Sequence, residues 1–195
     1  MDRFVDLSSP KLDADRYALG RMQGQYFNQR IAELYKIFKD FSQKQAKAQF
    51  GFLGSLLSPF SLYYLLRQGE KFESFIDAPF RLEMRGIAEG SGMDYCFIRL
   101  LNVLDDMINL SLCSAVGIYN PETQDYVYGS NLDYPLFLEA MRDNVFVVKK
   151  KNFISVGFPG YIGVLRGINR WGLFLASLTS KTKKRSNRFG IPNGL

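Results

Sequence analysis

The expected fold follows from residues 113–133, which read CSAVGIYNPETQDYVYGSNLD. Two runs rich in β-branched and aromatic residues, 114–119 and 125–131, flank the turn-forming sequence NPET at 120–123. This pattern predicts a β-hairpin whose first strand follows Cys113 directly. Further strands are expected at 144–149, 152–158, 161–168 and 172–179, with a turn at 169–172 between the last two. Residues 113–195 therefore predict an antiparallel meander.

The residues before this hairpin show helical periodicity instead. Apolar side chains recur at three- and four-residue spacing from Arg16 to Phe41, which predicts an amphipathic helix. A second helix is expected at 79–90, with Pro79 in its first turn and Gly90 at its C-terminal cap.

A third helix is expected after Asp94, whose carboxylate would cap it, and it runs toward Leu112.

The charge of the chain also changes at residue 113, where the helical periodicity ends. Residues 1–112 hold 14 basic and 14 acidic side chains, whereas residues 113–195 hold 11 and 5. A helical region at 1–112 followed by a β-rich region at 113–195 predicts the α+β class. The basic runs at 149–151 and 181–188 are expected to be solvated loops or strand ends, and the alternative is an anionic contact with lipid or nucleic acid. Of these two, nucleic acid is not expected as a partner.

Residues 50–66, FGFLGSLLSPFSLYYLL, carry no charge, and basic residues flank them on both sides. The segment is slightly short for a transmembrane helix, and its proline and serines argue against one. Two interpretations stay open. One is an interfacial or re-entrant segment that makes a peripheral membrane contact, and the other is a buried pair of helices bent at Pro59. The N-terminus carries no signal-peptide pattern, so we expect a cytoplasmic or peripheral membrane protein.

The composition limits the chemistry that is available. The chain has no histidine, which excludes Ser-His and Cys-His nucleophiles, histidine-ligated zinc and histidine general bases. Its two cysteines, Cys96 and Cys113, are too few for a disulfide framework and do not stand at metal-ligand spacing, so no metal or organic cofactor is expected.

A cysteine nucleophile without histidine can take its base from its own main chain. If a cut made Cys113 the first residue of a chain, the new α-amino group, with a pKa of about 8 in model compounds, would accept the thiol proton. Cys113 stands where the helical region ends and the first strand begins, which suits this role, although a buried strand cysteine is the plain alternative. Cys96 lies inside a predicted helix and is expected to be a small core residue.

Four segments, taken together and in this order along the chain, resemble the cysteine-type N-terminal nucleophile (Ntn) hydrolases. Residues 113–117 (CSAVG) and 128–135 (YGSNLDYP) resemble the signature of this superfamily, which includes choloylglycine hydrolase, acid ceramidase, N-acylethanolamine acid amidase and the penicillin acyl-coenzyme A acyltransferases. Residues 158–169 (FPGYIGVLRGIN), with the following Gly-Leu at 172–173, resemble its inner hairpin. Residues 83–92 (EMRGIAEGSG) resemble the propeptide helix of the acyltransferase and ceramidase branches.

The resemblance implies roles for individual residues. Cys113 would be the nucleophile, and the residues before it would be a propeptide or α-subunit, released or retained after self-cleavage between Leu112 and Cys113. Asp133 would bind the freed α-amino group, and the alternative is an ordinary strand-end residue. Asn131 would act either as a polar brace or as a turn former. Thr179 stands where choloylglycine hydrolases have an oxyanion-hole asparagine, and its hydroxyl could serve as the donor.

Two departures from the family pattern affect these expectations. Ser130 stands where the ceramidase and choloylglycine branches have an arginine, which favours the acyltransferase branch or a weakened site. Family members also continue past the equivalent of Leu195 with a second sheet, outer helices and a late catalytic asparagine. We therefore expect a missing C-terminal half or a second chain to complete the four-layer αββα sandwich.

The function that the resemblance implies is that of a self-processing amidase or acyltransferase. Its substrate would be a linear, non-peptide amide with a hydrophobic acyl group, such as an N-acyl amide or a ceramide-like lipid. The alternative is a non-catalytic or degenerate relative that associates with lipid or membrane and lacks part of the active site.

Overall fold

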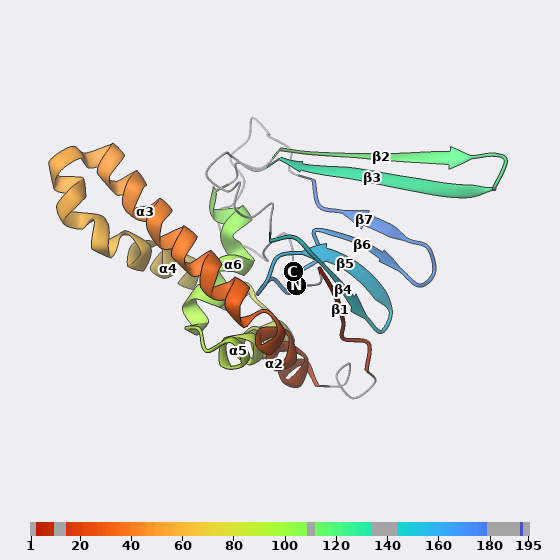
Figure 1. The fold of residues 1–195 in the computed structure, drawn as a ribbon, viewed down its shortest axis with the longest axis horizontal. Coiled ribbons are helices and arrows are strands. Elements are labelled where there is room, and N and C mark those ends of the chain that lie inside the picture. The colour runs from red at the N-terminus through yellow and green to blue at the C-terminus, as the bar shows by residue number, and fades with distance from the viewer. Residues whose placement is uncertain (1–2, 10–14, 109–111, 134–143, 179–191, 193–195) are drawn as a thin grey trace.

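The computed structural model describes residues 3–9, 15–108, 112–133, 144–178 and 192 (Figure 1). The helices are α2 (Arg16–Tyr26), α3 (Asn28–Leu57), α4 (Ser61–Glu70), α5 (Ala78–Ser91) and α6 (Tyr95–Ile108), with the 3₁₀ turns η1 (Ser58–Phe60) and η2 (Glu73–Phe75). The strands are β1 (Phe4–Asp6), β2 (Leu112–Asn120), β3 (Asp125–Asp133), β4 (Phe146–Lys150), β5 (Phe153–Gly157), β6 (Arg166–Asn169) and β7 (Phe174–Ala176). The chain has the α+β fold that its sequence predicts.

Within the described residues, the main sheet has the strand order β1-β4-β5-β6-β7. Strands β4 to β7 are antiparallel neighbours in chain order, which confirms the predicted meander for these strands. The sequence predicts that the meander includes the strands at 114–119 and 125–131 as well, but these form a separate sheet. Strand β1 is not predicted by the sequence, and it pairs in parallel with β4, with Phe4 opposite Val147 and Asp6 opposite Lys149. Three residues are too short to show a periodicity, so only the pairing with β4 defines this strand.

Strands β2 and β3 form a separate antiparallel hairpin that lies beside β7 (Figure 1). Its register pairs Leu112 with Asp133 at one end and Asn120 with Asp125 at the turn. The rings of Tyr128 on β3 and Phe174 on β7 stack with their centroids 4.8 Å apart, which joins the hairpin to the main sheet.

The helices and the main sheet share one hydrophobic core. Val5 of β1, Ile31 of α3, Ile87 of α5, Phe97 of α6 and Phe146 of β4 are all buried in the same cluster. The region before the hairpin is therefore packed onto the β-rich region, and its first residues extend the sheet of that region.

The helix predicted from Arg16 to Phe41 is two helices. Phe27 interrupts it with φ −102° and ψ 14°. This break lets the Phe27 ring pack on the ring of Phe146, with 4.5 Å between the two ring centroids. The second of these helices, α3, continues to Leu57. The periodicity is the same on both sides of the break, so the sequence pattern does not show where the axis changes.

Two other predicted boundaries are wrong. Helix α5 is capped by Gly92, which has φ +70°, rather than by Gly90. The strand predicted at 161–168 begins only at Arg166. The irregular segment before it is held by the buried Asn102, whose Nδ2 donates to the carbonyl of Gly160 at 2.8 Å and whose Oδ1 accepts from the amide of Ile162 at 2.8 Å.

Helices α2 and α5 cross in direct backbone contact. A Cβ placed on Gly20 would lie 2.0 Å from the carbonyl oxygen of Glu83, and one on Gly86 would lie 2.2 Å from that of Tyr17. Gly90 makes the same kind of contact with Arg21, which explains its presence inside the helix rather than at the cap. Glycine is needed at this crossing because any side chain would separate the two backbones.

Replacing a glycine at this crossing is expected to destabilise the fold. Gly20→Ala should lower the free energy of unfolding by about 1–3 kcal/mol through overpacking, although alanine favours an isolated helix by about 1 kcal/mol. Gly69→Ala in α4 is the matched control, because its nearest neighbour is the Val103 side chain at 3.6 Å, an ordinary contact. Urea unfolding measures both, and equal stability of the two variants would contradict the close crossing.

A buried ion cluster also connects the helices to the sheet. Glu83 of α5 is fully buried, and its carboxylate accepts from Lys150 of β4 at 2.8 Å and from Arg16 of α2 at 2.8 Å. The expectation that the run 149–151 is solvated is therefore wrong for Lys150, and the run 181–188 lies outside the described residues. The alternating burial of β4 turns Lys150 inward, whereas Lys149 stays half exposed and pairs with Asp6 at 2.8 Å.

Residues 50–66 form the end of α3, the turn η1 and the first part of α4. The helix pair bent near Pro59 is confirmed, but the burial expected with it is not. Most large side chains of this segment are exposed, and Phe52 is 88 % exposed. Among the described residues, no helix is both long and apolar enough to cross a membrane.

Candidate active site

Cys113 is the second residue of β2, and its side chain is half-buried. The register pairs Cys113 with Leu132 and Leu112 with Asp133. The main chain of Asp133 therefore lies across from the Leu112–Cys113 peptide bond. The two positions that the sequence assigns to the nucleophile and to the binding of its amino group come together at this end of the hairpin.

The face of the hairpin that carries Cys113 is turned toward the main sheet. Directly paired residues share a face and alternate residues repeat it, so Cys113, Ala115 and Ser130 lie on one side. Ser130 contacts the main sheet, because its hydroxyl accepts a hydrogen bond from Nε of Arg166 on β6 at 2.6 Å. Diagonal neighbours on one face lie about 7–8 Å apart, which places Cys113 close to this contact.

Arg166 is buried and holds the hairpin against the sheet. Besides Ser130, it donates to the carbonyl oxygens of Asn131 at 3.0 Å, Leu165 at 2.6 Å and Ser177 at 2.8 Å. These described acceptors are all neutral oxygens. Within the part of the chain that the structure describes, the guanidinium is therefore stabilised by dipoles rather than by a carboxylate.

A cavity of about 190 Å³ lies between β3 and the main sheet, next to Arg166. Its lining is apolar except for one end, where the Ser130 hydroxyl and the Arg166 guanidinium are found. The lining residues are Ser130, Val145, Val156, Gly157, Phe158, Leu165 and Arg166. An apolar space with a few polar groups at one end is suited to a ligand with an apolar chain and a polar head.

The other expected site residues are only partly described. Asn131 pairs with Ser114 on the opposite face of the hairpin from Cys113, and its side chain is exposed. The side chain of Asp133 and the whole of Thr179 lie outside the described residues. The structure thus brings together the main chains of Cys113, Asn131 and Asp133, while the oxyanion role of Thr179 stays a prediction.

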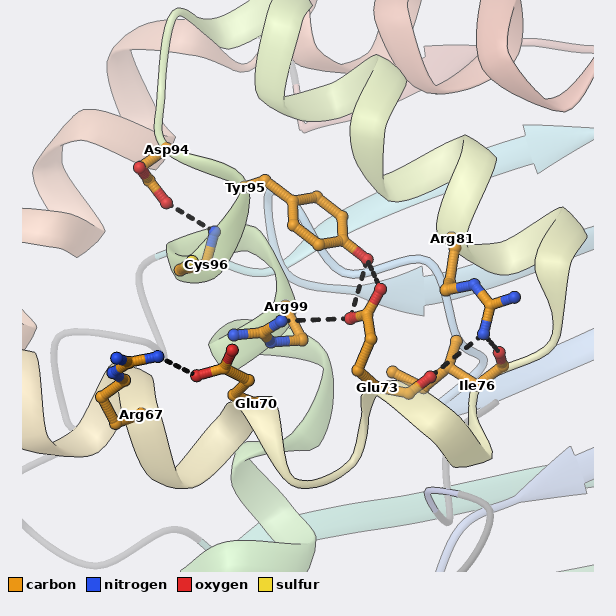
Figure 2. Close-up of polar contacts among 9 residues, drawn as sticks. All are labelled: Arg67, Glu70, Glu73, Ile76, Arg81, Asp94, Tyr95, Cys96 and Arg99. Carbon is orange, nitrogen blue, oxygen red and sulfur yellow. Dashed lines mark hydrogen bonds and ion pairs between the residues drawn. The ribbon is translucent and has the colours of Figure 1, made fainter.

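Cys96 lies in a different environment (Figure 2). Its amide donates to Asp94 at 2.6 Å, which confirms Asp94 as the cap of α6. Burial raises the pKa of the Cys96 thiol, with a further contribution from Asp94. A raised pKa keeps the thiol protonated and unreactive, so Cys96 is a poor nucleophile.

Figure 2 also shows polar contacts near Cys96 that hold neighbouring helices together. Glu73 accepts from the hydroxyl of Tyr95 at 2.9 Å and from Arg99 at 3.1 Å, and Arg81 donates to the carbonyl of Ile76 at 2.7 Å. Burial, and then the bond to Glu73, raise the pKa of Tyr95 to about 12. Each contact joins η2, or Ile76 directly after it, to α5 or α6, so the cluster positions helices.

Sequence reasoning did not single out Arg166 as a functional residue. The signal was present, because Arg166 is the sole charged residue in the otherwise apolar and glycine-rich run Gly163–Ile168. A charge inside such a strand must find buried partners. Among the described residues, no group of three or more acidic or cysteine side chains could hold a metal ion.

Replacing Arg166 is expected to loosen the hairpin. Arg166→Met removes the hydrogen bonds of the guanidinium, each worth about 1.5–3 kcal/mol with a charged donor, so amide exchange in residues 126–132 should accelerate at least about tenfold. Exchange in α5 should not change. Arg170→Met is the control, because Arg170 is exposed and stacks on Trp171. Unchanged exchange in Arg166→Met would show that other contacts hold the hairpin.

Comparison with protein-family models finds no match for this chain, and comparison with curated protein sequences finds no significant match either. The assignment of a function therefore depends on the residues and the geometry described above.

Proposed function

We propose that this chain is a self-processing cysteine amidase of the Ntn-hydrolase type, acting on a linear, non-peptide amide with a hydrophobic acyl group. The observation that carries the proposal is the position of Cys113. It begins a hairpin, Asp133 lies opposite the preceding residue, and its face of the hairpin is turned toward Arg166 and an apolar cavity.

The first reaction in this proposal frees the nucleophile. Sγ of Cys113 adds to the carbonyl carbon of Leu112, and the peptide C–N bond breaks as its nitrogen takes a proton. Water then hydrolyses the resulting thioester, which leaves a carboxylate on Leu112 and an α-amino group on Cys113. The chain supplies its own base by this step, which accounts for an active site without histidine.

The second reaction is the cleavage of the substrate. The α-amino group of Cys113 takes the thiol proton, and the sulfur attacks the amide carbonyl. The C–N bond of the substrate breaks as the leaving amine receives that proton. Water then resolves the acyl thioester, releasing the fatty or other hydrophobic acid and the free thiol.

The neighbouring residues have separate roles in the proposal. The Asp133 carboxylate would orient the α-amino group, with Asn131 as a brace, and the hydroxyl of Thr179 would donate to the oxyanion. Ser130 replaces an arginine of the ceramidase and choloylglycine branches. The contact between Arg166 and Ser130 supports the idea that Arg166 brings a guanidinium to the same place from β6.

The lining of the cavity supports a hydrophobic acyl group. Val145, Val156, Phe158 and Leu165 offer apolar surface, and burying the chain of an acyl group there is worth about 25 cal/mol per Å² of apolar surface. The polar end of the cavity, at Ser130, is on the same face as Cys113. An amide carbonyl at that end would lie toward the thiol.

We propose that a further structural element covers the face of the hairpin opposite Cys113. Val116, Ile118 and Val127 lie on the face opposite Cys113 and are exposed. A continuation of the chain or a second chain with an apolar sheet would bury them and complete a layered sandwich.

The helical region is expected to stay bound after the cut. Strand β1 is paired with β4, Glu83 is ion-paired with Lys150, and both regions contribute to one core. These contacts join the two pieces that the cut would produce, and none of them requires an intact Leu112–Cys113 bond.

The mass of the purified, freshly expressed chain tests the proposal. Two pieces that separate between Leu112 and Cys113 would support it, and a series of N-acyl amides with increasing acyl length would then identify the substrate. A single uncut mass would exclude self-processing for this 195-residue chain.

A further inference from the structure

The helical hairpin formed by α3, η1 and α4 projects away from the sheet (Figure 1). Its far end carries a cluster of large apolar side chains, of which Phe52 is 88 %, Leu56 68 % and Phe60 66 % exposed. We define the tip patch as Phe52, Leu53, Leu56, Leu57, Phe60 and Tyr64, all of which are exposed. A contiguous apolar patch of this kind marks a contact surface, whereas scattered exposed apolar residues do not.

The packing of the hairpin forces these side chains outward. Gly51, with φ +55° and ψ −125°, breaks the axis of α3 and folds residues 52–57 back. A Cβ on Gly54 would lie 2.0 Å from the carbonyl of Ala46, so the two segments are in backbone contact. The side of residues 52–57 that faces the preceding part of α3 carries the small residue Gly54, and the large side chains of this segment point away from α3.

Near its tip, the buried positions of the hairpin are small or polar. Ser42 and Ser58 are buried, and the hydroxyl of Ser61 donates to that of Ser42 at 3.1 Å. In a helical hairpin stabilised in water alone, the large apolar side chains would be expected inside and the serines outside. This inverted distribution indicates that the tip patch is matched to an apolar environment outside the protein.

The charges around the tip indicate which environment. No acidic residue occurs between Asp40 and Glu70, whereas Lys44 and Lys47 occur there and are exposed. Arg67 is also in this stretch, but it is paired with Glu70. Basic side chains near an anionic lipid surface are attracted to it. Tyr64 of the tip patch and the adjacent Tyr63 are exposed and suit the level of the lipid headgroups.

We propose that the tip patch inserts into the interfacial layer of a bilayer containing anionic phospholipids, with Lys44 and Lys47 at the headgroups. The tip is a convex end of a helical hairpin, and a short insertion of apolar side chains next to basic ones is the arrangement of interfacial membrane anchors. This contact does not depend on the reaction of Cys113. It would hold the protein at the surface where amides with long acyl chains are found.

Sedimentation of the full chain with vesicles of equimolar phosphatidylcholine and phosphatidylserine tests the proposal. The wild type should bind these vesicles, bind pure phosphatidylcholine vesicles more weakly, and lose affinity at high salt. The double variant Phe52→Ser, Leu56→Ser should bind at least about tenfold more weakly, because two inserted side chains are lost. Both residues are exposed, so the variant should keep the circular dichroism spectrum of the wild type.

A matched control removes exposed apolar side chains elsewhere. Leu173→Ser, Leu175→Ser changes two exposed leucines at and beside β7 and should bind vesicles like the wild type. Equal binding by the tip variant and the wild type would overturn the proposal, as would equal losses in both double variants. A tip-dependent dimer in the absence of vesicles would overturn it too, since the patch would then contact a second copy.

Fluorescence gives an independent measure of insertion. Trp171 is the only tryptophan, so Phe52→Trp in a Trp171→Phe background reports on the tip alone. Its emission should shift to shorter wavelength with anionic vesicles, and an unchanged emission would contradict insertion. Cys113→Ala should bind vesicles like the wild type, which separates failure of this proposal from failure of the proposed chemistry.

Discussion

The Cys113→Ala variant is expected to remain a single uncut chain and to lose amide hydrolysis. Without the thiol there is no group to attack the Leu112 carbonyl, and no 1,2-aminothiol is formed at residue 113. Removal of a nucleophile lowers turnover by at least about 10⁴-fold, so activity on N-acyl amides should fall to background. This is the largest effect expected of any single substitution in this chain.

Three measurements check this result together. Intact mass reports the cut, a cyanobenzothiazole probe labels only a chain that begins with cysteine, and product formation reports hydrolysis. A native mass should show that the two pieces of the wild type remain associated, because β1 stays in the sheet. The probe separates a cut before Cys113 from proteolysis at any other bond.

Cys96→Ala is the matched control. The Cys96 thiol is on α6, and burial raises its pKa, so its removal should leave processing and activity unchanged. Loss of processing in Cys96→Ala but not in Cys113→Ala would show that the thiol that cuts the chain is that of Cys96 and not that of Cys113. Processing that persists in Cys113→Ala would exclude Cys113 as the nucleophile of the cut.

The second large effect is expected at Glu83. Glu83→Ala leaves Lys150 buried without its carboxylate, and removing one partner of a buried pair costs about 3–5 kcal/mol. A typical domain has a total stability of only about 5–15 kcal/mol, so this variant should be close to unfolding. The loss should appear as a lower midpoint in urea.

Two further variants define the cause of that loss. Glu33→Ala removes an exposed pair with Arg30 and should cost less than about 1 kcal/mol. The double variant Glu83→Met, Lys150→Met removes both buried charges and should recover most of the lost stability, which keeps the test valid if Glu83→Ala does not fold. Equal costs for Glu83→Ala and Glu33→Ala would show that the buried cluster does not stabilise the fold.

Local patterns in the sequence were enough to predict most elements. The capping role of Asp94, the hairpin at 113–133 and the turn at 169–172 each depend on contacts between near neighbours. In that turn, Asn169 Oδ1 accepts from the amides of Trp171 and Leu173 at 3.0 Å, and Gly172 adopts φ +84°. Such contacts are set by residue type and spacing, which the sequence contains.

The errors occur where distant residues decide the local structure. Phe27 breaks a continuous helical pattern to reach Phe146, and Asn102 holds residues 161–165 out of the strand pattern. Gly90 is not a cap because it contacts α2. In each case tertiary packing outweighs a local preference worth about 1 kcal/mol or less per residue.

The candidate site divides in the same way. The sequence singled out Cys113 as the candidate nucleophile by the absence of histidine, by its place between helix and strand, and by the resemblance of its surroundings to a family. It did not identify Arg166, because the link to Ser130 joins residues that are 36 positions apart. Only the packing of the hairpin on β6 brings that guanidinium to the face of Cys113.

The sequence by itself determined the α+β class. It also offered a helix pair bent at Pro59 as one of two alternatives for residues 50–66, and a cysteine without a histidine base as the candidate nucleophile. These follow from periodicity and composition, which act locally. The tertiary structure decided that Lys150 is buried on Glu83, that Arg166 reaches Ser130, and that the large side chains of the tip patch point outward. Burial and ion pairing depend on which surfaces meet, and that is set by the packing of the whole chain.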